Sequence, residues 1–148
     1  SELTIAGSYR RKNKDSGDID LLLKGSNKRI YDKFIDTLVK EGYLTCQLAR
    51  GNKKYMGMGK IDISPCHRRI DIMYTKPEEY PFAILYFTGS GDFNVRMREN
   101  ALKRGYTMNE YSIKHTENKQ KVDKVFLEEK EIFDFLGYQY LNPEDRIQ

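Results

Sequence analysis

Two aspartates stand two residues apart in the segment 17–23, which reads GDIDLLL. On an extended chain alternate side chains point to opposite faces, so Asp18 and Asp20 share one face while Ile19 and Leu21 share the other. Two carboxylates held this close repel each other unless a cation lies between them, and Mg²⁺ prefers oxygen ligands. The pattern predicts a buried apolar face and, opposite it, a pair of candidate metal ligands.

A third carboxylate, Asp71, lies in the similar segment 69–74, RIDIMY. Ile70 and Ile72 mark the buried face of this strand, so Asp71 must project from the other face together with Arg69. If the two strands are neighbours, three carboxylates converge, as is required to hold two metal ions about 4 Å apart during phosphoryl transfer. The alternative is that all three are solvent-facing residues of amphipathic strands, because alternation alone produces such patterns.

A short basic segment separates the first apolar strand from the two aspartates. Gly7 allows close backbone approach, and the Ser8 hydroxyl and nearby backbone N–H groups can donate to phosphate oxygens. Arg11 adds a forked donor suited to the same oxygens. A glycine turn after a strand is common and weak evidence alone. Followed about ten residues later by the two aspartates, it predicts a phosphate-binding loop facing a metal site.

The elements that must position these residues form a strand-rich first half. Apolar residues that recur at three- and four-residue spacing after Ser26 predict a helix that stops at Gly42. Short apolar runs bounded by turn residues predict strands. They cover residues 3–6, 19–23, 43–50, 54–63 and 69–74, with the basic segment 9–17 turning between the first two. These elements indicate an α+β fold, a sheet with at least one helix against it.

The two prolines within residues 76–81 disfavour helix before them and predict a boundary between a subdomain 1–77 and a subdomain 78–148. In the second subdomain we expect three elements with regular patterns. They are a helix over 92–104 that buries Phe93, Met97 and Ala101 and ends at Gly105, a hairpin of 111–116 with 122–127, and a helix over 128–136 that buries Phe133 and Leu136.

Composition narrows the class of protein. The 148 residues carry a formal net charge of +4, which is compatible with a polyanionic partner without requiring one. Two cysteines give no readable disulfide framework or four-ligand zinc site. No apolar run approaches the about 20 residues of a membrane span, so we expect a soluble, intracellular protein. The chain starts without methionine, which suggests a fragment or a processed chain.

Several motifs together resemble those of family X DNA polymerases, most closely the polymerase beta and lambda branch. They are GSYRR, GDIDLLL, HRRIDI, LYFTGS, FNVRMR, NEY and PEDR, in the family's order and approximate spacing from Gly7 onward. The resemblance implies a nucleotidyltransferase-type catalytic palm over 1–77, followed by a small α+β nucleotide-selecting subdomain over 78–148. It implies template-directed addition of deoxynucleotides to a primer 3′-hydroxyl, in DNA repair, by a monomer that uses two magnesium ions, replaceable by manganese.

The same resemblance implies roles for individual residues. Asp18 and Asp20 are similar to the ligands of both metal ions, and Asp71 to the third ligand, which helps accept the primer hydroxyl proton beside Arg69. The residues implied to bind the incoming deoxynucleoside triphosphate are Ser8, Arg11 and Gly17 at the phosphates, Tyr86 and Phe87 at the sugar, Gly89 and Ser90 in a turn with a cis peptide, and Asn94 and Arg98 at the nascent base pair. Glu110 and Tyr111 resemble a structural link that positions the second subdomain.

Without the resemblance, Tyr86 and Phe87 would be interpreted as core residues, and Asn94 and Arg98 as ordinary surface residues. Gly91 and Met73 depart from beta-type enzymes, which carry an aspartate and an arginine there. The segments that bind gapped DNA and remove deoxyribose phosphate are not represented, so neither activity is predicted. Two other functions stay open: a template-independent or different nucleotidyltransferase on the same scaffold, and a non-catalytic fragment that binds nucleotide or DNA.

Overall fold

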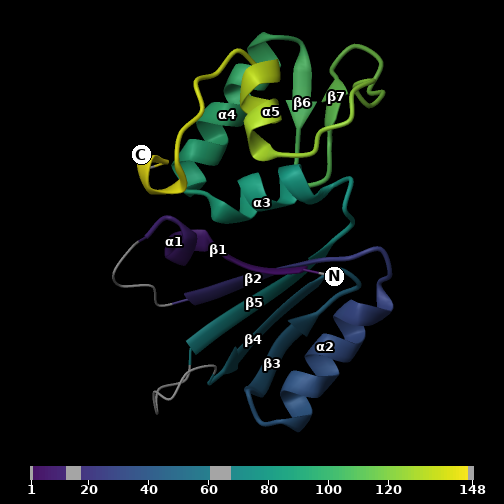
Figure 1. Cartoon of the computed structure of the whole chain (residues 1–148), viewed down its shortest axis with the longest axis vertical. Helices are drawn as coiled ribbons and strands as arrows, with labels where there is room; N and C mark the ends of the chain where they lie inside the picture. Colours follow the sequence, from purple (N-terminus) through teal and green to yellow (C-terminus); the bar gives the residue numbers. More distant parts are fainter. Residues whose placement is uncertain (1, 13–17, 61–67, 147–148) are drawn as a thin grey trace.

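The computed structural model describes residues 2–12, 18–60 and 68–146, and the description below refers to these. The chain forms a lower part built on a sheet and an upper part built mainly of helices (Figure 1). The sheet has the strand order β1-β2-β5-β4-β3. Its strands are β1 (Glu2–Ala6), β2 (Asp18–Lys24), β3 (Leu44–Arg50), β4 (Lys54–Gly59) and β5 (Arg68–Thr75).

The sheet is mixed, because β2 and β5 run parallel while the other neighbouring strands are antiparallel. This arrangement confirms the predicted α+β class, a sheet with at least one helix against it. The parallel pair also confirms that the two aspartate-bearing strands are neighbours, with Asp20 directly opposite Asp71. Strands far apart in the sequence thereby bring their carboxylates to one face.

The two faces of the sheet are buried against different helices. Helix α2 (Arg29–Lys40) packs on one face, where Tyr31 and Ile35 contact the odd-numbered apolar residues of β2 and the isoleucines of β5. On the other face Leu22 and Met73 pack against helix α3 (Tyr80–Thr88). Asp20 and Asp71 precede Leu22 and Met73 by two residues and so lie on the face that α3 covers.

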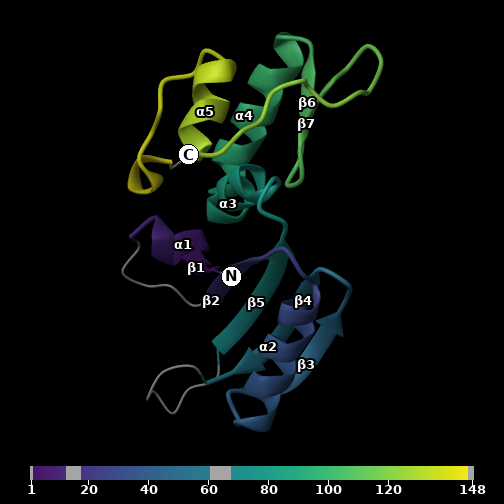
Figure 2. The same cartoon turned by 45° about the vertical axis from the view of Figure 1, so that its right-hand side comes forward.

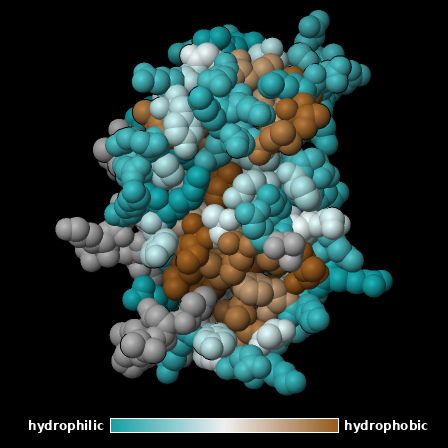
Figure 3. Space-filling model, in the orientation of Figure 1, coloured by the Kyte–Doolittle hydropathy of each residue, from teal (hydrophilic) through white to brown (hydrophobic). Residues whose placement is uncertain are grey.

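Helix α2 covers only part of its face of the sheet. Beside it, apolar side chains of β1, β2 and α2 line an open groove of about 430 Å³, and Leu3, Ile5 and Tyr9 in it are partly exposed. Figure 3 shows the hydrophobic side chains gathered on this side of the lower part. The face that α3 covers is also buried only in part, since Met56, which pairs with Asp71, is 37% exposed.

The upper part has its own hydrophobic core. It contains α4 (Gly91–Lys103), the short strands β6 (Tyr106–Met108) and β7 (Ile113–His115), α5 (Glu129–Phe135) and a 3₁₀ turn, η1 (Pro143–Asp145). As predicted, Phe93, Met97 and Ala101 of α4 are buried, and so are Phe133 and Leu136. Helix α3 is apolar all round because it serves both parts: Phe82 and Leu85 enter this core while Ala83 and Ile84 face the sheet.

Figure 2 shows α3 lying between the upper helices and the sheet. No helix of the described residues is long and apolar enough to cross a membrane.

Two local predictions are confirmed only in part. The start of the segment 9–17 is not only a turn: Gly7–Arg10 forms a one-turn helix, α1, before the chain turns at residues 11 and 12. The predicted hairpin of 111–116 with 122–127 is confirmed only next to its tip, where His115 N donates to the Gln120 carbonyl and Val122 N to the Ile113 carbonyl around the Lys114–Lys121 bridge. The three-residue ladder of β7 is formed with β6 instead. Beyond Val122 the apolar side chains do not share one buried face, since Phe126 is buried while Val125 and Leu127 are exposed.

Candidate functional site

A cleft of about 770 Å³ lies where α1, the strands β2, β4 and β5 and the helices α3 and α4 meet. It collects most of the residues singled out from the sequence. Its lining includes Ser8, Arg11, Asp18, Asp20, Asp71, Tyr86, Phe87, Gly89, Asn94 and Arg98. Arg69 is not part of this lining but donates to Asp71, and Ser90 lies between the lining residues Gly89 and Gly91. Gly17 lies outside the described residues.

The carboxylates occupy one wall of the cleft. Asp20 is opposite Asp71 in the β2–β5 register, and it also lies against Gly7, which has φ +65°. A Cβ atom at Gly7 would come within 2.0 Å of Asp20 Oδ2. Glycine is needed at this position for both reasons, the left-handed backbone and the close approach of the carboxylate.

The electrostatics of this wall are those of crowded anions. Burial, together with the charges of Asp71 and Asp18, raises the pKa of Asp20 to about 6, although Arg11 and Arg69 oppose the change. Arg69 Nε donates to Asp71 Oδ1 over 2.8 Å, as expected. A divalent cation would relieve the repulsion, and three carboxylates supply the oxygen ligands that magnesium prefers.

Among the described residues, no group of three or more histidine, cysteine, aspartate or glutamate side chains has the arrangement of a metal site. Asp18, Asp20 and Asp71 line the same cleft. Their donor chemistry fits magnesium, and their assignment as its ligands stays a proposal.

The phosphate-binding residues expected at the start of the chain lie on α1 and in the turn after it. Ser8 lines the cleft from α1, and Arg11 reaches across the cleft to donate from Nη1 to the backbone carbonyl of Thr88. Gly89 allows this approach, since a Cβ there would lie 3.1 Å from Arg11 Nη1. The peptide between Gly89 and Ser90 is cis, as the resemblance implied.

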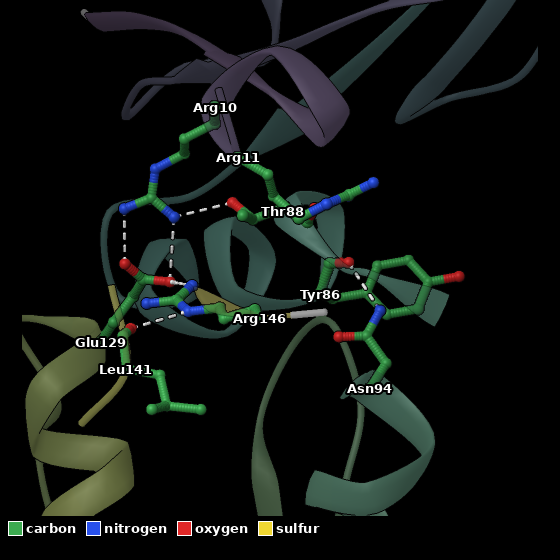
Figure 4. Close-up of polar contacts among 8 residues, drawn as sticks. All are labelled: Arg10, Arg11, Tyr86, Thr88, Asn94, Glu129, Leu141 and Arg146. Atoms are coloured by element: carbon green, nitrogen blue, oxygen red, sulfur yellow. Dashed lines mark hydrogen bonds and ion pairs between the residues drawn. The ribbon is translucent and has the colours of Figure 1, made fainter. Parts of the chain in front are cut away.

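The opposite wall comes from the end of α3 and the start of α4. Tyr86 and Phe87 are both half-buried and face the cleft. Arg98 lies 5.0 Å from the centre of the Tyr86 ring. Asn94 Nδ2 donates to the Tyr86 carbonyl over 2.8 Å, as Figure 4 shows. Ser90 begins α4, where its Oγ accepts from Phe93 N. Asn94 and Ser90 therefore help to shape this wall.

The structure adds a cluster that the sequence interpretation missed. Arg10 donates to both carboxylate oxygens of Glu129, over 2.6 and 3.1 Å, and to Thr88 Oγ1 over 2.7 Å. From the other side Arg146 Nη1 donates to Glu129 Oε2 over 2.7 Å (Figure 4). This Arg10–Glu129–Arg146 cluster joins α1 of the lower part to α5 and the C-terminal segment.

Arg146 is fully buried and holds its surroundings through several contacts. Its Nε donates to the Leu141 carbonyl over 3.0 Å, and its own carbonyl accepts from Ser90 N over 3.2 Å. Its guanidinium lies 5.2 to 5.7 Å from the ring centres of Phe133, Tyr140 and Phe93. The C-terminal segment thus supports the turn that begins α4.

A signal for this cluster was present in the sequence. On α5, Glu129 occupies the same face as the buried Ile132, Phe133 and Leu136, at three, four and seven residues from them. A carboxylate on an apolar helix face is buried, and a buried charge requires a partner. The identity of the partners, Arg10 and Arg146, could not be found from local spacing.

Comparison with known protein families finds a match over both parts of the chain. The family model described as DNA polymerase beta palm matches residues 1–77, and the one described as DNA polymerase beta thumb matches residues 83–147.

Individual proteins show the same similarity. DNA polymerase lambda of Rattus norvegicus is 33% identical over 159 residues, covering 95% of this chain and 28% of the relative. Repair DNA polymerase X of African swine fever virus (strain Badajoz 1971 Vero-adapted) is 27% identical over 145 residues, covering 98% of this chain and 81% of the relative. The chain thus spans little more than a quarter of the first of these proteins.

Among solved structures, the Leishmania infantum polymerase beta in a ternary P/T complex superposes with a TM-score of 0.87 at 31% identity. The match covers 99% of this chain and 67% of that one. The arrangement of both parts is therefore similar to one observed in a solved structure.

Proposed function

Because this chain belongs to family X of the DNA polymerases, we propose that it is the catalytic portion of a template-directed DNA polymerase that acts in DNA repair. Residues 1–77 carry the catalytic carboxylates, and residues 78–148 select the nucleotide. The substrates are a DNA primer–template and a deoxynucleoside triphosphate, and the reaction joins the primer 3′-hydroxyl to the α-phosphate.

Asp18, Asp20 and Asp71 are the residues that would hold magnesium. The bound ions would supply Lewis-acid stabilisation of the primer oxygen and of the departing pyrophosphate. Asp71 has a second role as acceptor of the primer hydroxyl proton. Arg69 orients it by holding Oδ1, which leaves Oδ2 for the proton.

The nucleotide is held between the two walls of the cleft. Ser8 and Arg11 bind the triphosphate, with Gly17 as a further backbone donor. Tyr86 and Phe87 line the sugar beside the turn of Gly89 and Ser90. Asn94 and Arg98, one turn apart on α4, lie beside the nascent base pair, where a cation and an amide meet the acceptor atoms of base edges.

One observation carries this proposal: Asp20 and Asp71 lie side by side on parallel neighbouring strands, on one wall of a cleft that Arg11 and Arg98 also line. Anions on one wall suit metal ions, and cations around them suit phosphates. A cleft built only for an uncharged ligand would have no need for this separation of charge.

The test is extension of a labelled primer annealed to a template, with each deoxynucleotide in turn and magnesium present. Asp71→Asn keeps the size of the side chain and removes its charge, so we expect extension to fall by about a thousand-fold or more. Asp36→Asn is a matched control, since Asp36 is exposed on α2 and pairs with Arg50 far from the cleft. It should retain full activity.

Retained extension by Asp71→Asn, with wild-type thermal unfolding in both variants, would overturn the assignment. Equal extension of a single-stranded primer without template would favour a template-independent nucleotidyltransferase instead. Magnesium-dependent nucleotide binding with no incorporation by the wild-type protein would favour a non-catalytic binding fragment.

A further inference from the structure

Lys54 opens strand β4 and reaches toward the upper part of the molecule. Its Nζ lies 3.4 Å from Glu110 Oε2 and 5.6 Å from the centre of the Tyr86 ring. It also lines the cleft. The neighbouring Lys53 lies over the ring of Tyr111, 4.7 Å from its centre. Two consecutive lysines therefore contact the segment that connects β6 and β7.

The surroundings of Lys54 make Glu110 its anionic partner in the free protein. Opposite Lys54 in the β4–β5 register stands Met73, which is fully buried and uncharged. Arg98 also lies over the Tyr86 ring, but it is a cation like Lys54 and cannot form an ion pair with it. Among the contacts described for Glu110, Lys54 supplies the cation, so the pair joins the sheet to the upper part at the mouth of the cleft.

In this pair, another anion can replace Glu110 as the partner of Lys54. The Lys54 side chain is 46% exposed, and an ion pair with such an exposed partner contributes little to stability. A DNA backbone competes well for such a lysine, since binding to phosphate releases condensed counterions. Arg10 could not be exchanged in this way, because its partner Glu129 is buried between two arginines.

We propose that Lys54 binds a phosphate of the DNA substrate, and that Glu110 holds this lysine in the free protein and competes with DNA for it. The inference rests on the proposed function, and it assigns to both residues a role in substrate binding. DNA entry would exchange the Lys54–Glu110 pair for a Lys54–phosphate pair and release the β6–β7 connection from β4. Glu110 thereby lowers the affinity of the free protein for DNA.

The proposal predicts opposite effects from the two partners, measured as the affinity for a fluorescent primer–template duplex over a range of salt concentrations. Glu110→Gln removes the competitor, so binding should tighten by about two- to fivefold. Lys54→Met removes the phosphate contact. It should weaken binding by about five- to tenfold at 0.1 M salt and reduce the slope of log affinity against log salt by about one.

The double variant should bind like Lys54→Met, because Glu110 acts only through Lys54. Lys54→Arg keeps the charge and should keep the wild-type slope. Glu2→Gln is the matched control: Glu2 pairs with Lys24 over 2.7 Å on β1 and β2, and the substitution changes the net charge as Glu110→Gln does. It should leave the affinity unchanged.

Weakened binding in both single variants would mean that the pair is only a structural link, and would overturn the proposal while leaving the proposed function intact. Tightening by Glu2→Gln equal to that by Glu110→Gln would overturn it as well, by showing a general effect of net charge. A wild-type protein that does not bind the duplex at any salt concentration would overturn the proposed function together with this inference.

Discussion

Of the ionic contacts that join the lower and upper parts of the molecule, two differ clearly in solvent exposure. The Arg10–Glu129–Arg146 cluster connects α1 to α5, and its Glu129 and Arg146 side chains are 8% and 0% exposed. The Lys54–Glu110 pair connects β4 to the β6–β7 segment, and its side chains are 46% and 18% exposed. In the buried cluster, water cannot take the place of either charged partner. In the Lys54–Glu110 pair, water or a phosphate can take the place of Glu110.

Burial, more than distance, decides how much an ion pair stabilises the protein and whether another ion can replace one of its partners. Removing a charge from water costs several kcal/mol, which only good geometry and full hydrogen bonding repay. The cluster nearly meets this requirement, since Glu129 accepts from two arginines, although Arg146 Nη2 has no partner among the described residues. The exposed pair loses little when it separates.

The largest expected effect comes from neutralising the centre of the cluster. Glu129→Gln keeps the shape but leaves the Arg146 guanidinium buried without a counter-ion. We expect the free energy of unfolding to fall by about 3 kcal/mol, the lower end of the range for a broken buried pair, because the amide oxygen still accepts one hydrogen bond. Urea titration followed by circular dichroism measures this loss.

The comparison supplies the control for this prediction. Glu110→Gln makes the same chemical change in the exposed pair and should cost less than about 1 kcal/mol. Equal losses from the two variants would contradict the view that burial separates the two contacts.

A second, smaller effect should appear as pH changes. Burial raises the pKa of Glu129, but hydrogen bonds from Arg10 and Arg146 outweigh this and hold the pKa below its ordinary value of 4.5. A carboxyl group whose pKa is lower in the folded state stabilises the protein above its unfolded pKa, and this contribution is lost as pH falls through the folded pKa.

The stability difference between the wild-type protein and Glu129→Gln should therefore be constant from pH 7 down to about pH 5.5. It should shrink below pH 4.5, as the wild-type carboxyl group becomes protonated. Unfolding titrations of both proteins at each pH measure it. A difference that stays the same down to pH 3 would show that the charge of Glu129 does not carry the stabilisation.

The two contacts also mark the limit of what sequence patterns predict. Alternation in β2 and β5 fixed which face each aspartate takes, and helical spacing predicted α2 and the buried face of α4. Such patterns report on neighbours within about two turns of helix. Arg10 and Glu129 are 119 residues apart and Lys54 and Glu110 are 56 apart, so no local period relates them. The resemblance to family X polymerases singled out Glu110, but it did not identify Lys54 as its partner.

The sequence patterns did not predict the pairing of β6 with β7, for a related reason. Three-residue strands such as β6 carry too little alternation to be distinguished from a loop. The predicted partner, 122–127, contributes no ladder, and the contact of this region with β7 is a single bridge between Lys114 and Lys121. Here the tertiary packing of Met108 and Ile113 into the upper core decides the pairing.

The smallest effect is expected from a third contact between the two parts, that of Lys12 with Glu144. Lys12 Nζ lies 2.8 Å from Glu144 Oε2, close to the 2.6 and 2.7 Å of the two arginine pairs with Glu129, but the two side chains are 76% and 34% exposed. Lys12 also has φ +62°, a left-handed backbone that glycine adopts more readily than lysine.

Lys12→Gly removes the ion pair and relaxes the backbone at once. If exposure makes the pair nearly neutral, the variant should unfold at a urea concentration no lower than that of the wild-type protein. A clear decrease in the midpoint would show that a well-formed exposed pair can stabilise this junction, and burial would then not be the property that separates its contacts.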